Sequence, residues 1–281
     1  MLLIGGGVVL ALVLVFLWVL GGEDPDGQGG QGESVTAAPS SPAGSASAAE
    51  VPTLAPGMRL AAPGVSMTAE RVAAAPVIDG VYNDWADRPA YVSDHVIAPI
   101  GVTSGVSARW WLSWDPQALY VFASVTDPVI TQTHAGEPSQ LYQGDSVSFE
   151  VGPYLDAISV EQLQDGDVHV LIGPTQDGGW ARAINIAGGA HLVTGPAWDS
   201  GAVGVMITAD GYDVEAAIPW ATLRLTPPEA GQVIAMNLNV SDAWPDGPGR
   251  GELAAMLSNN PDRLTNSATK RDIWGALHLN P

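Results

Sequence analysis

The chain has 281 residues, with 30 acidic against 10 basic side chains, and its formal net charge of −20 excludes the basic patch that nucleic-acid binding requires. The same charge disfavours docking on anionic lipid head groups and suits neutral or cationic partners. Because cysteine is absent, disulfides, thiolate zinc sites and thiol nucleophiles are also excluded.

The first 20 residues, MLLIGGGVVLALVLVFLWVL, carry no charged side chain. A helix of this length, at ~1.5 Å per residue, matches the ~30 Å hydrocarbon core of a bilayer. A cleaved secretory signal is the alternative, but the basic n-region and a nearby small-residue cleavage site are missing. We therefore predict an uncleaved transmembrane helix over residues 1–20. It would place the protein in the cell membrane as a single-pass protein with an extracellular C-terminal domain.

Residues 21–75 are rich in Gly, Ser, Ala and Pro, as in QGGQGESVTAAPSSPAGSASAA. Such a segment cannot bury enough apolar surface to offset the entropy lost on ordering. We predict a disordered stalk here, of which residues 54–75 pack as an extended lead-in. The folded domain would then span residues 76–281, enough for one β-sandwich or barrel.

The domain opens with VIDGVYNDW, residues 77–85. Asp-Gly is a turn signal, and short acidic side chains commonly bond nearby backbone N–H groups in turns and caps. We therefore interpret Asp79 and Asp84 as turn and cap residues in preference to metal ligands. Trp85 is expected to be part of the core.

Several later runs alternate apolar and polar residues, the two-residue period of half-buried strands. In SARWWLSW (107–114), the even-numbered residues from Ala108 to Trp114 share one face and Trp111 takes the other. The other predicted strands are 119–127, 145–152, 167–173, 202–210, 212–220 and 232–242. Turn signals separate these strands without helical patterns between them, apart from one turn near Trp220–Leu223. The pattern predicts an all-β fold, a two-sheet antiparallel β-sandwich of the jelly-roll or immunoglobulin type.

Six segments together carry a family resemblance: PVIDGVYNDW (76–85), WDPQALYVFASVTDP (114–128), GDSVSFEVG (144–152), GYDVEAAIPW (211–220), VIAMNLNVSDA (233–243) and WGALHL (274–279). Each is weak alone, but their order and spacing are fairly specific. Together they resemble carbohydrate-binding module family 9, within the wider group of DOMON-like sandwiches. The resemblance implies a carbohydrate-binding β-sandwich of the kind often attached to glycan-degrading enzymes.

The resemblance also implies where a sugar would bind. Family members sandwich a pyranose between two aromatic rings and bond its hydroxyls with charged and amide side chains. The first ring falls on Tyr142, the family's Glu on Ser148 and its basic residue on His169. The amide falls on Leu171 and the second ring on Ala268, so the match is incomplete.

With one ring and neutral hydrogen-bond partners, sugar binding is expected to be weak, of millimolar order, or about −4 kcal/mol. Trp180, in a Gly-rich loop, is the first candidate for a substitute ring. For a metal, the resemblance points to calcium held by loop carboxylates, and Asp127 and Asp145 match motif acids of the family. The sequence DGDVH, with Asp165 and Asp167, also alternates carboxylates, but no full D-x-D-x-D-G loop is present.

Other chemistries have weaker support. The five histidines show no zinc-binding spacing, and no G-x-S-x-G motif is present. Glu150 and Glu215 lie on predicted strands and could in principle pair for glycoside hydrolysis, but we favour the interpretation of Glu215, in DVEAAIPW, as a structural residue of that motif. Some DOMON-like relatives bind haem between their sheets, and Met206, Met236 and His169 are the candidate axial ligands here.

We therefore predict a membrane-tethered, non-catalytic module whose partner is a neutral glycan and which serves glycan degradation or cell-surface attachment. No cofactor is expected beyond the calcium hypothesis. The alternative is a structural or protein-interaction sandwich that has lost the sugar site, and a haem-binding domain is a third interpretation.

Overall fold

The computed structural model describes residues 58–60, 65–99, 105–153, 158–160, 162–175, 179–188, 191–194, 202–260, 271 and 274–281. By its internal contacts the chain divides into two units, Met1–Val51 and Pro52–Pro281, and all described residues lie in the second. The predicted anchor and most of the predicted stalk lie outside the described residues. Within the described ranges, no helix is long and apolar enough to cross a membrane.

The domain is all-β. Its strands are β1 (Met58–Leu60), β2 (Ser66–Arg71), β3 (Tyr91–Ser93), β4 (His95–Pro99), β5 (Ser107–Trp114), β6 (Ala118–Thr126), β7 (Ser146–Pro153), β8 (Ile158–Val160), β9 (Val168–Pro174), β10 (Trp180–Gly188), β11 (His191–Thr194), β12 (Ala202–Ile207), β13 (Gly211–Pro219), β14 (Val233–Ala243), β15 (Leu253–Ser258) and β16 (Gly275–Asn280). Two 3-10 helices accompany them, η1 (Tyr82–Asp84) and η2 (Pro138–Gln143).

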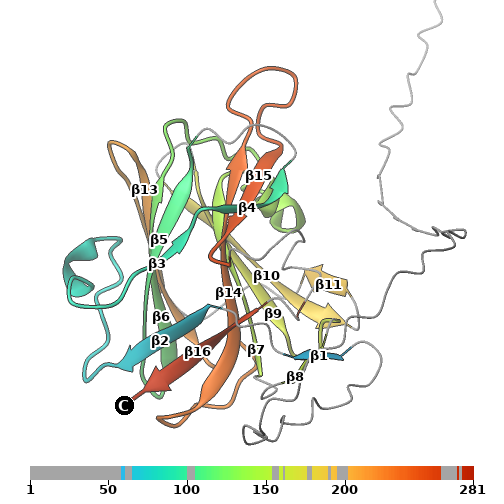
Figure 1. The fold of residues 1–281 in the computed structure, drawn as a ribbon. Helices are drawn as coiled ribbons and strands as arrows, with labels where there is room; N and C mark the ends of the chain where they lie inside the picture. The colour runs from blue at the N-terminus through green and yellow to red at the C-terminus, as the bar shows by residue number, and fades with distance from the viewer. Residues whose placement is uncertain are drawn as a thin grey trace, which may run out of the picture. The chain divides into compact units, whose positions relative to one another are not determined.

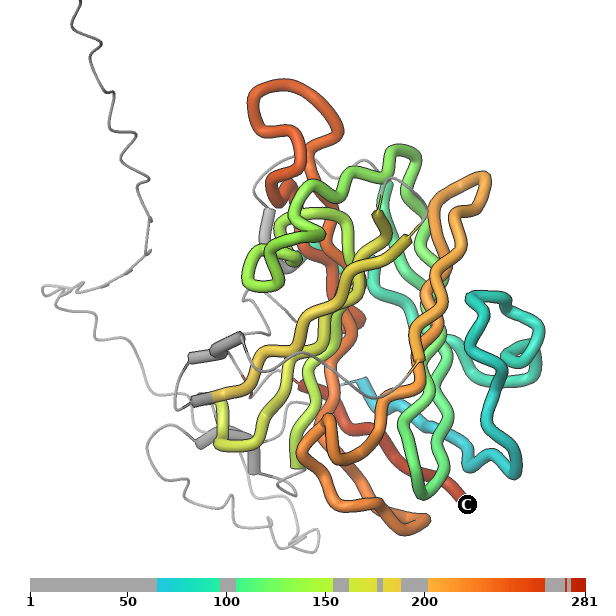
Figure 2. The backbone as a smooth tube through the Cα atoms, turned by 180° about the vertical axis from the view of Figure 1, so that it is seen from behind, coloured from blue at the N-terminus to red at the C-terminus, as the bar shows by residue number. Residues whose placement is uncertain are grey.

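Fourteen of these strands form the two layers of a sandwich and are hydrogen-bonded into one sheet, while β1 and β8 pair in a separate two-stranded sheet. The order is β11-β10-β9-β7-β14-β16-β2-β5-β6-β13-β12, with β15 added to β14, β4 to β15 and β3 to β5. Strands β5, β6 and β13 lie side by side in one layer and β7, β9 and β10 in the other, with β14 and β16 between them (Figure 1). Seen from behind, the orange hairpin β12–β13 runs along the green strands of its own layer, apart from yellow β10 (Figure 2).

The prediction of two purely antiparallel sheets was wrong in one respect. Strand β2 pairs parallel with β16 on one side and with the end of β5 on the other. The first long strand of the domain thus meets the last one, and together they bridge the two layers. Alternation along single strands predicts which side chains point inward, but it carries no information on the direction of a partner so distant in the chain.

The domain also begins before the predicted boundary at residue 76. Strand β2 lies inside the segment predicted as stalk, and its Met67 and Ala69 side chains are fully buried in the main core. Only the expectation of an extended lead-in over residues 54–75 agrees with this finding. The signal was faint because the strand is short and has only two inward-facing apolar residues.

The predicted strands 107–114, 119–127, 145–152, 167–173, 212–220 and 232–242 are confirmed within about two residues at each end, while the strand predicted over 202–210 ends at residue 207. The even-numbered residues of β5 lie in the main core as predicted. Each buried indole N–H finds an acceptor: Trp110 donates to Ser93 Oγ (3.0 Å) and Trp220 to the carbonyl of Asp115 (2.8 Å). The predicted turn after β13 is also present, since Leu223 N donates to the Pro219 carbonyl.

A second apolar cluster lies on the outward face of β5, β6 and β13, where Trp111 packs with Trp85, Tyr120 and Phe122. The segment of residues 72–88, which we call the strap, covers this cluster. Within the strap, Asp79 accepts a hydrogen bond from Val81 N and Asp84 accepts one from Val77 N, as predicted for turn residues.

Glu215 of β13 fixes the strap. Its carboxylate is fully buried and accepts hydrogen bonds from the backbone N–H groups of Asp79 (3.0 Å) and Gly80 (2.9 Å) and from Trp85 Nε1 (2.9 Å). Gly80 adopts a φ of 79°, which favours glycine. Gly204 of β12 lies beneath this turn, and a Cβ there would come within 2.6 Å of Gly80 N. The turn can approach the sheet because both positions are glycine.

Candidate functional site

The outward face of β7, β9, β10 and β14 is lined by polar side chains that are nearly all buried, and we call it the polar face. Strand register places Asn185, His169, Glu150 and Asn237 side by side in one row and Ser148, Asn239 and Ser258 in the next. Apart from Asn185, which is half-buried, each of these side chains is at most 4% exposed. Polar groups are not normally buried on the outside of a sandwich without a function or a full set of partners.

Glu150 is the centre of this face. Its carboxylate accepts hydrogen bonds from Asn239 Nδ2 (2.9 and 3.1 Å) and Asn237 Nδ2 (3.3 Å). His169 Nε2 lies 3.5 Å from Glu150 Oε1. Burial lowers the pKa of His169 to about 4, so its imidazole is neutral at physiological pH. The face therefore offers carboxylate and amide groups with a neutral imidazole.

Several polar atoms of this face have no hydrogen-bond partner among the described residues although they are buried. They are Ser148 Oγ, His169 Nε2, Asn185 Oδ1 and Ser241 Oγ. Leaving such an atom unsatisfied costs about 1–3 kcal/mol. Four of them on one sheet face indicate space for a polar ligand or ordered water.

The short helix η2 packs on β7, β9, β10 and β14 and carries Tyr142, whose side chain is 36% exposed. The preceding residue, Leu141, is fully buried against Leu171 and Ala183 of the sheet. Gln132 Nε2 holds the helix by donating to the Leu141 carbonyl (3.1 Å) and the Asp145 carbonyl (3.0 Å). Tyr142 is thus presented beside the polar face, while Leu171, at the family's amide position, fills part of it with apolar contacts.

Of the predicted sugar-site residues, the structure brings Tyr142, Ser148 and His169 to one side of the sheet. Trp180 is placed differently. It is the first residue of β10, pairs with Pro174, and shares its strand face with Ile184, which points into the core. Trp180 also lies under the guanidinium of Arg182, 5.0 Å from its ring centre. By strand alternation it faces the opposite side from His169. Ala268 lies outside the described residues.

Sequence reasoning missed Glu150, Asn237 and Asn239 as members of this face. A signal was present, because DSVSFEVG and AMNLNVS place polar residues at every second position of strands that are apolar on their other face. Such a pattern is also typical of an ordinary solvated sheet face. Only the burial of these groups separates the two interpretations.

Asp127 and Asp145, the predicted calcium ligands, lie together at the ends of β6 and β7. Asp145 is fully buried and accepts hydrogen bonds from Ala243 N (2.6 Å) and Thr131 N. Burial, together with repulsion from Asp127, holds the pKa of Asp145 well above its usual range. One oxygen of Asp127, Oδ2, is buried without a partner among the described residues.

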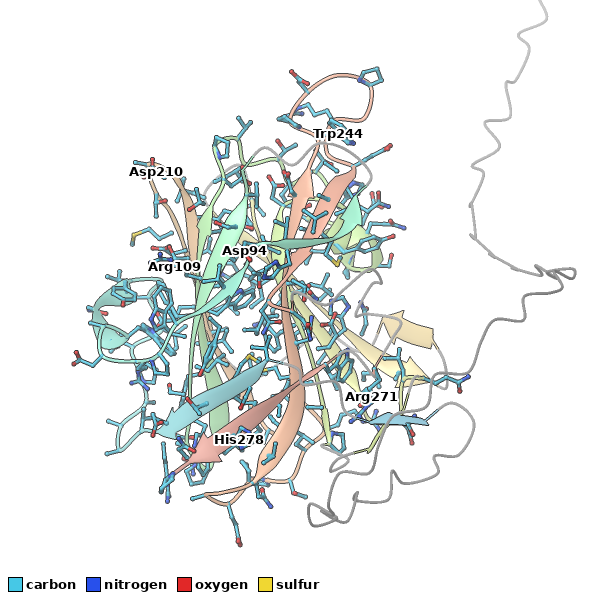
Figure 3. The ribbon with its side chains drawn as sticks, in the orientation of Figure 1. Asp94, Arg109, Asp210, Trp244, Arg271 and His278 are labelled. Atoms are coloured by element: carbon cyan, nitrogen blue, oxygen red, sulfur yellow. The ribbon has the colours of Figure 1, made fainter. Side chains whose placement is uncertain are left out.

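A cation would relieve both problems, so these two carboxylates fit a hard cation. They form a partial site, because within the described ranges no group of three or more His, Cys, Asp or Glu side chains is arranged to hold a metal. Asp167 is not available as a ligand there. Its carboxylate accepts from Gln164 N (2.7 Å) and pairs with the buried guanidinium of Arg271 (2.9 Å), the residue labelled beside this layer in Figure 3.

Two other hypotheses conflict with the placement of their residues. Glu150 and Glu215 lie on the outward faces of different layers, so they do not face a common cleft as a glycosidase pair would. Met236 is buried in the main core, His169 lies on the polar face, and Met206 is exposed on the outward side of the other layer. These three residues do not converge on a single haem iron.

The model of the family described as carbohydrate family 9 binding domain-like matches residues 77–280. The chain is 30% identical over 173 residues to Exoglucanase XynX of Acetivibrio thermocellus and 28% identical over 174 residues to Endo-1,4-beta-xylanase A of Thermoanaerobacterium saccharolyticum. These alignments cover 61% of this chain but only 14% and 13% of the two relatives. The chain therefore corresponds to a small part of much longer proteins.

Among solved structures, the fold is similar to a family 9 carbohydrate-binding module from Caldicellulosiruptor kristjanssonii, seen in complexes with cellotriose and with glucose. The TM-scores are 0.56 and 0.54 at 23% identity, over 77% and 76% of this chain and 94% and 95% of those chains. A putative carbohydrate-binding protein from Bacteroides uniformis gives a TM-score of 0.54 at 13% identity, over 77% of this chain and 99% of that one. At these identities the likeness concerns the fold.

Proposed function

Because this chain belongs to the family 9 carbohydrate-binding domains, we propose that it is a non-catalytic module that binds a neutral saccharide at the polar face beside Tyr142. Its role would be to hold a glycan for degradation by an associated enzyme or to attach the cell surface to one. The enzymes among its relatives and the cellotriose and glucose complexes support a glucan or xylan chain as the ligand class.

One observation carries this proposal: within the described residues, the buried Ser148 Oγ and His169 Nε2 have no hydrogen-bond partner, on a sheet face that an exposed aromatic ring borders. A sugar has an apolar C–H face that stacks on an aromatic ring and an edge of hydroxyls that need directional partners. Tyr142 supplies the ring, and Ser148 and His169 supply neutral donors and acceptors. The net charge of −20 supports a neutral ligand over an anionic one.

Because Ser148 and His169 are neutral partners and Ala268 stands where the family has its second ring, we expect weak binding, of millimolar order. The test is titration of the protein with cellohexaose and xylohexaose, comparing the parent with Tyr142→Ala. We expect the variant to lose at least about fivefold in affinity, since stacking on a ring is worth about 1 kcal/mol. Trp180→Ala, which removes a similarly exposed ring on the opposite face of β10, controls for loss of surface aromatics. If Tyr142→Ala binds like the parent, the polar face is not the site.

We also propose that Asp127 and Asp145 hold a structural calcium ion near this face. When bound, calcium would supply positive charge to two buried carboxylates and so fix the segment between β6 and η2. The support is the raised pKa of Asp145 and the unpartnered Oδ2 of Asp127. Differential scanning calorimetry with calcium and with a chelator tests it independently of sugar binding.

For the location, we propose that residues 1–20 remain attached as a membrane anchor and place the domain outside the cell. The support is the uncharged apolar run at the N-terminus. Mass analysis of the protein isolated from membranes tests this proposal. A mature N-terminus within residues 21–75 would instead identify a cleaved signal.

A protein-interaction domain is the second candidate function. The contact of Leu141 with Leu171 and Ala183 favours it, because these side chains occupy part of the surface that the family uses for sugar. Absence of saturable binding to any saccharide on a glycan array, in a protein shown to be folded, would favour this candidate over the first.

A further inference from the structure

The strap covers only part of the outward face of the layer that contains β5, β6 and β13. Trp111, Phe122 and Glu215 lie beneath it in one cross-strand row, which continues to Gly204 of β12. The turn at Gly80 ends against the backbone of Val205 and Met206. The next row of the same face is therefore left outside the strap.

This open row crosses five strands, and we call it the shelf. Strand register places Val92, Arg109, Ser124, Asp213 and Met206 side by side along β3, β5, β6, β13 and β12. Val92 is 40% exposed and Met206 42%, and Arg109 is also exposed. At ~4.8 Å between strands the shelf extends about 19 Å, which accommodates several pyranose units in a row. Figure 3 shows Arg109 on this layer, on the side of the domain away from Arg271.

Tyr82 of the strap forms the border of the shelf. Its ring meets Trp111 edge to face at 4.8 Å between centroids, and 38% of the side chain remains exposed. Trp111 is two residues from Arg109 on the same face of β5, so the row on which the tyrosine packs is the one next to the shelf. Packing on Trp111 and Phe122 holds the ring in place, which lowers the entropy that a stacked ligand would cost.

The polar groups of the shelf are also unsatisfied. Within the part of the chain that the structure describes, the guanidinium of Arg109 has no hydrogen-bond or ion-pair partner. Asp213 Oδ1 is buried without a partner, and burial raises the pKa of this carboxyl although a hydrogen bond from Ser124 opposes the change. Arg109 offers donors and Asp213 an acceptor, on either side of β6.

We propose that the shelf is a second saccharide-binding site, on the layer opposite the polar face, which holds an extended neutral glycan chain across the strands. The occupant follows from the chemistry. A positioned aromatic ring, apolar ends, and one donor and one acceptor of opposite charge complement C–H faces and hydroxyl groups. An anionic ligand would find a single arginine next to Asp213 in a protein of net charge −20.

This inference goes beyond the proposed function and does not require the polar face to bind. The experiment titrates the full-length chain with cellohexaose and xylohexaose in the Tyr142→Ala background, which removes the ring of the polar face. We expect residual binding in that background. Adding Arg109→Gln or Asp213→Asn should weaken it at least about fivefold, and adding Tyr82→Leu at least about tenfold. Leucine retains apolar packing on Trp111, and circular dichroism melting checks that each variant folds.

Arg250→Gln is the matched control, because Arg250 is exposed on the loop between β14 and β15 and lies off both faces. It should bind like its background. The shelf is overturned if folded Tyr142→Ala shows no residual binding, or if Arg109→Gln, Asp213→Asn and Tyr82→Leu all leave that binding unchanged. If Tyr142→Ala alone binds like the parent and the added shelf substitutions abolish that binding, the shelf is retained and the polar face is overturned as a binding site.

Discussion

Each layer of the sandwich carries one fully buried glutamate on its outward face, and the two glutamates have different surroundings. Glu215 receives its hydrogen bonds from two backbone N–H groups and an indole of the strap, more than 100 residues away in the chain. Within the described residues, Glu150 accepts hydrogen bonds from the side-chain amides of Asn237 and Asn239 on its own sheet, beside buried atoms that have no partner there. Residue type and burial alone do not distinguish a glutamate that fixes the strap from a glutamate of the candidate site. The origin of the hydrogen-bond donors does distinguish them.

The largest expected effect is on stability, and it tests the role of Glu215 in fixing the strap. Glu215→Ala removes the acceptor of three buried donors, and at about 1–3 kcal/mol for each unsatisfied group the loss is roughly 4 kcal/mol. Glu150→Gln keeps an oxygen that accepts from the asparagines and should cost roughly 1 kcal/mol. Urea unfolding of both variants measures the difference, with Glu229→Ala at an exposed position as the control. Equal losses of unfolding free energy in Glu215→Ala and Glu150→Gln would contradict the different roles assigned to the two glutamates.

A second prediction concerns the polar face, where His169 should make the stability of the protein depend on pH. The pKa of folded His169 is about 4, below the ~6.5 of an unfolded histidine, so the unfolded state binds more protons between these values. This residue's contribution to stability is therefore fully present above about pH 6.5 and is lost as the pH falls toward 4. The difference between these two pKa values corresponds to at most roughly 3 kcal/mol.

His169→Gln should abolish that part of the pH dependence while leaving the remainder. Urea unfolding at several pH values between 4 and 7 measures it. His134→Gln, at a half-buried position off the polar face, is the comparison variant. An unchanged slope in His169→Gln would mean that the imidazole takes up its proton at the same pH in the folded and unfolded states.

The layer cores were more predictable from sequence than either outward face. Alternation in SARWWLSW correctly placed Trp110 inward and Trp111 outward, because an inward side chain needs only an apolar residue at every second position. Strand β10 was missed because Ala181 and Ala183 replace polar residues on its outward face, where η2 packs. Strand β15, LAAMLS, was missed because it is apolar on both faces.

The site was predictable only in part, for a related reason. The family's motif spacing pointed to Tyr142, Ser148 and His169, and the structure brings these three residues to one side of the sheet. The facing of Trp180 depends on the register of β10 against β9, which no local pattern contains. The role of Glu150 depends on amides that lie 87 and 89 residues further along the chain.

A third prediction concerns the carboxylates of Asp127 and Asp145, which lie at the ends of β6 and β7. If calcium binds Asp127 and Asp145, a concentration of one hundred times its dissociation constant should stabilise the protein by about 2.7 kcal/mol. Because the pKa of Asp145 is raised, the metal-free protein holds a proton there that calcium must displace, so the affinity should increase as the pH rises through neutrality.

Calorimetric melting with calcium and with a chelator, at two pH values, measures both effects. Asp127→Asn should remove the response to calcium and, in chelator, raise the stability, because it removes the charge that, together with burial, raises the pKa of Asp145 in the folded protein. Asp210→Asn, at an exposed hairpin position, should leave the response intact. A calcium response that survives in Asp127→Asn would place the ion elsewhere.

The smallest expected effect is that of deleting residues 1–53, which supply no residue of the polar face or of the shelf. Both buried glutamates, the strap and β2 lie within residues 66–281, and residues 21–53 lack the apolar content to contribute to a core. Deleting residues 1–53 should therefore change the melting temperature by less than about 2 °C, corresponding to well under 1 kcal/mol in a domain of this size. Deleting residues 1–71 instead removes β2, whose Met67 and Ala69 are buried and which joins β16 to β5, and should prevent folding. Calorimetry of the two truncations and of the full-length chain measures these effects. A fall of many degrees in the melting temperature of the shorter deletion would show that the segment before residue 54 packs on one of the two layers.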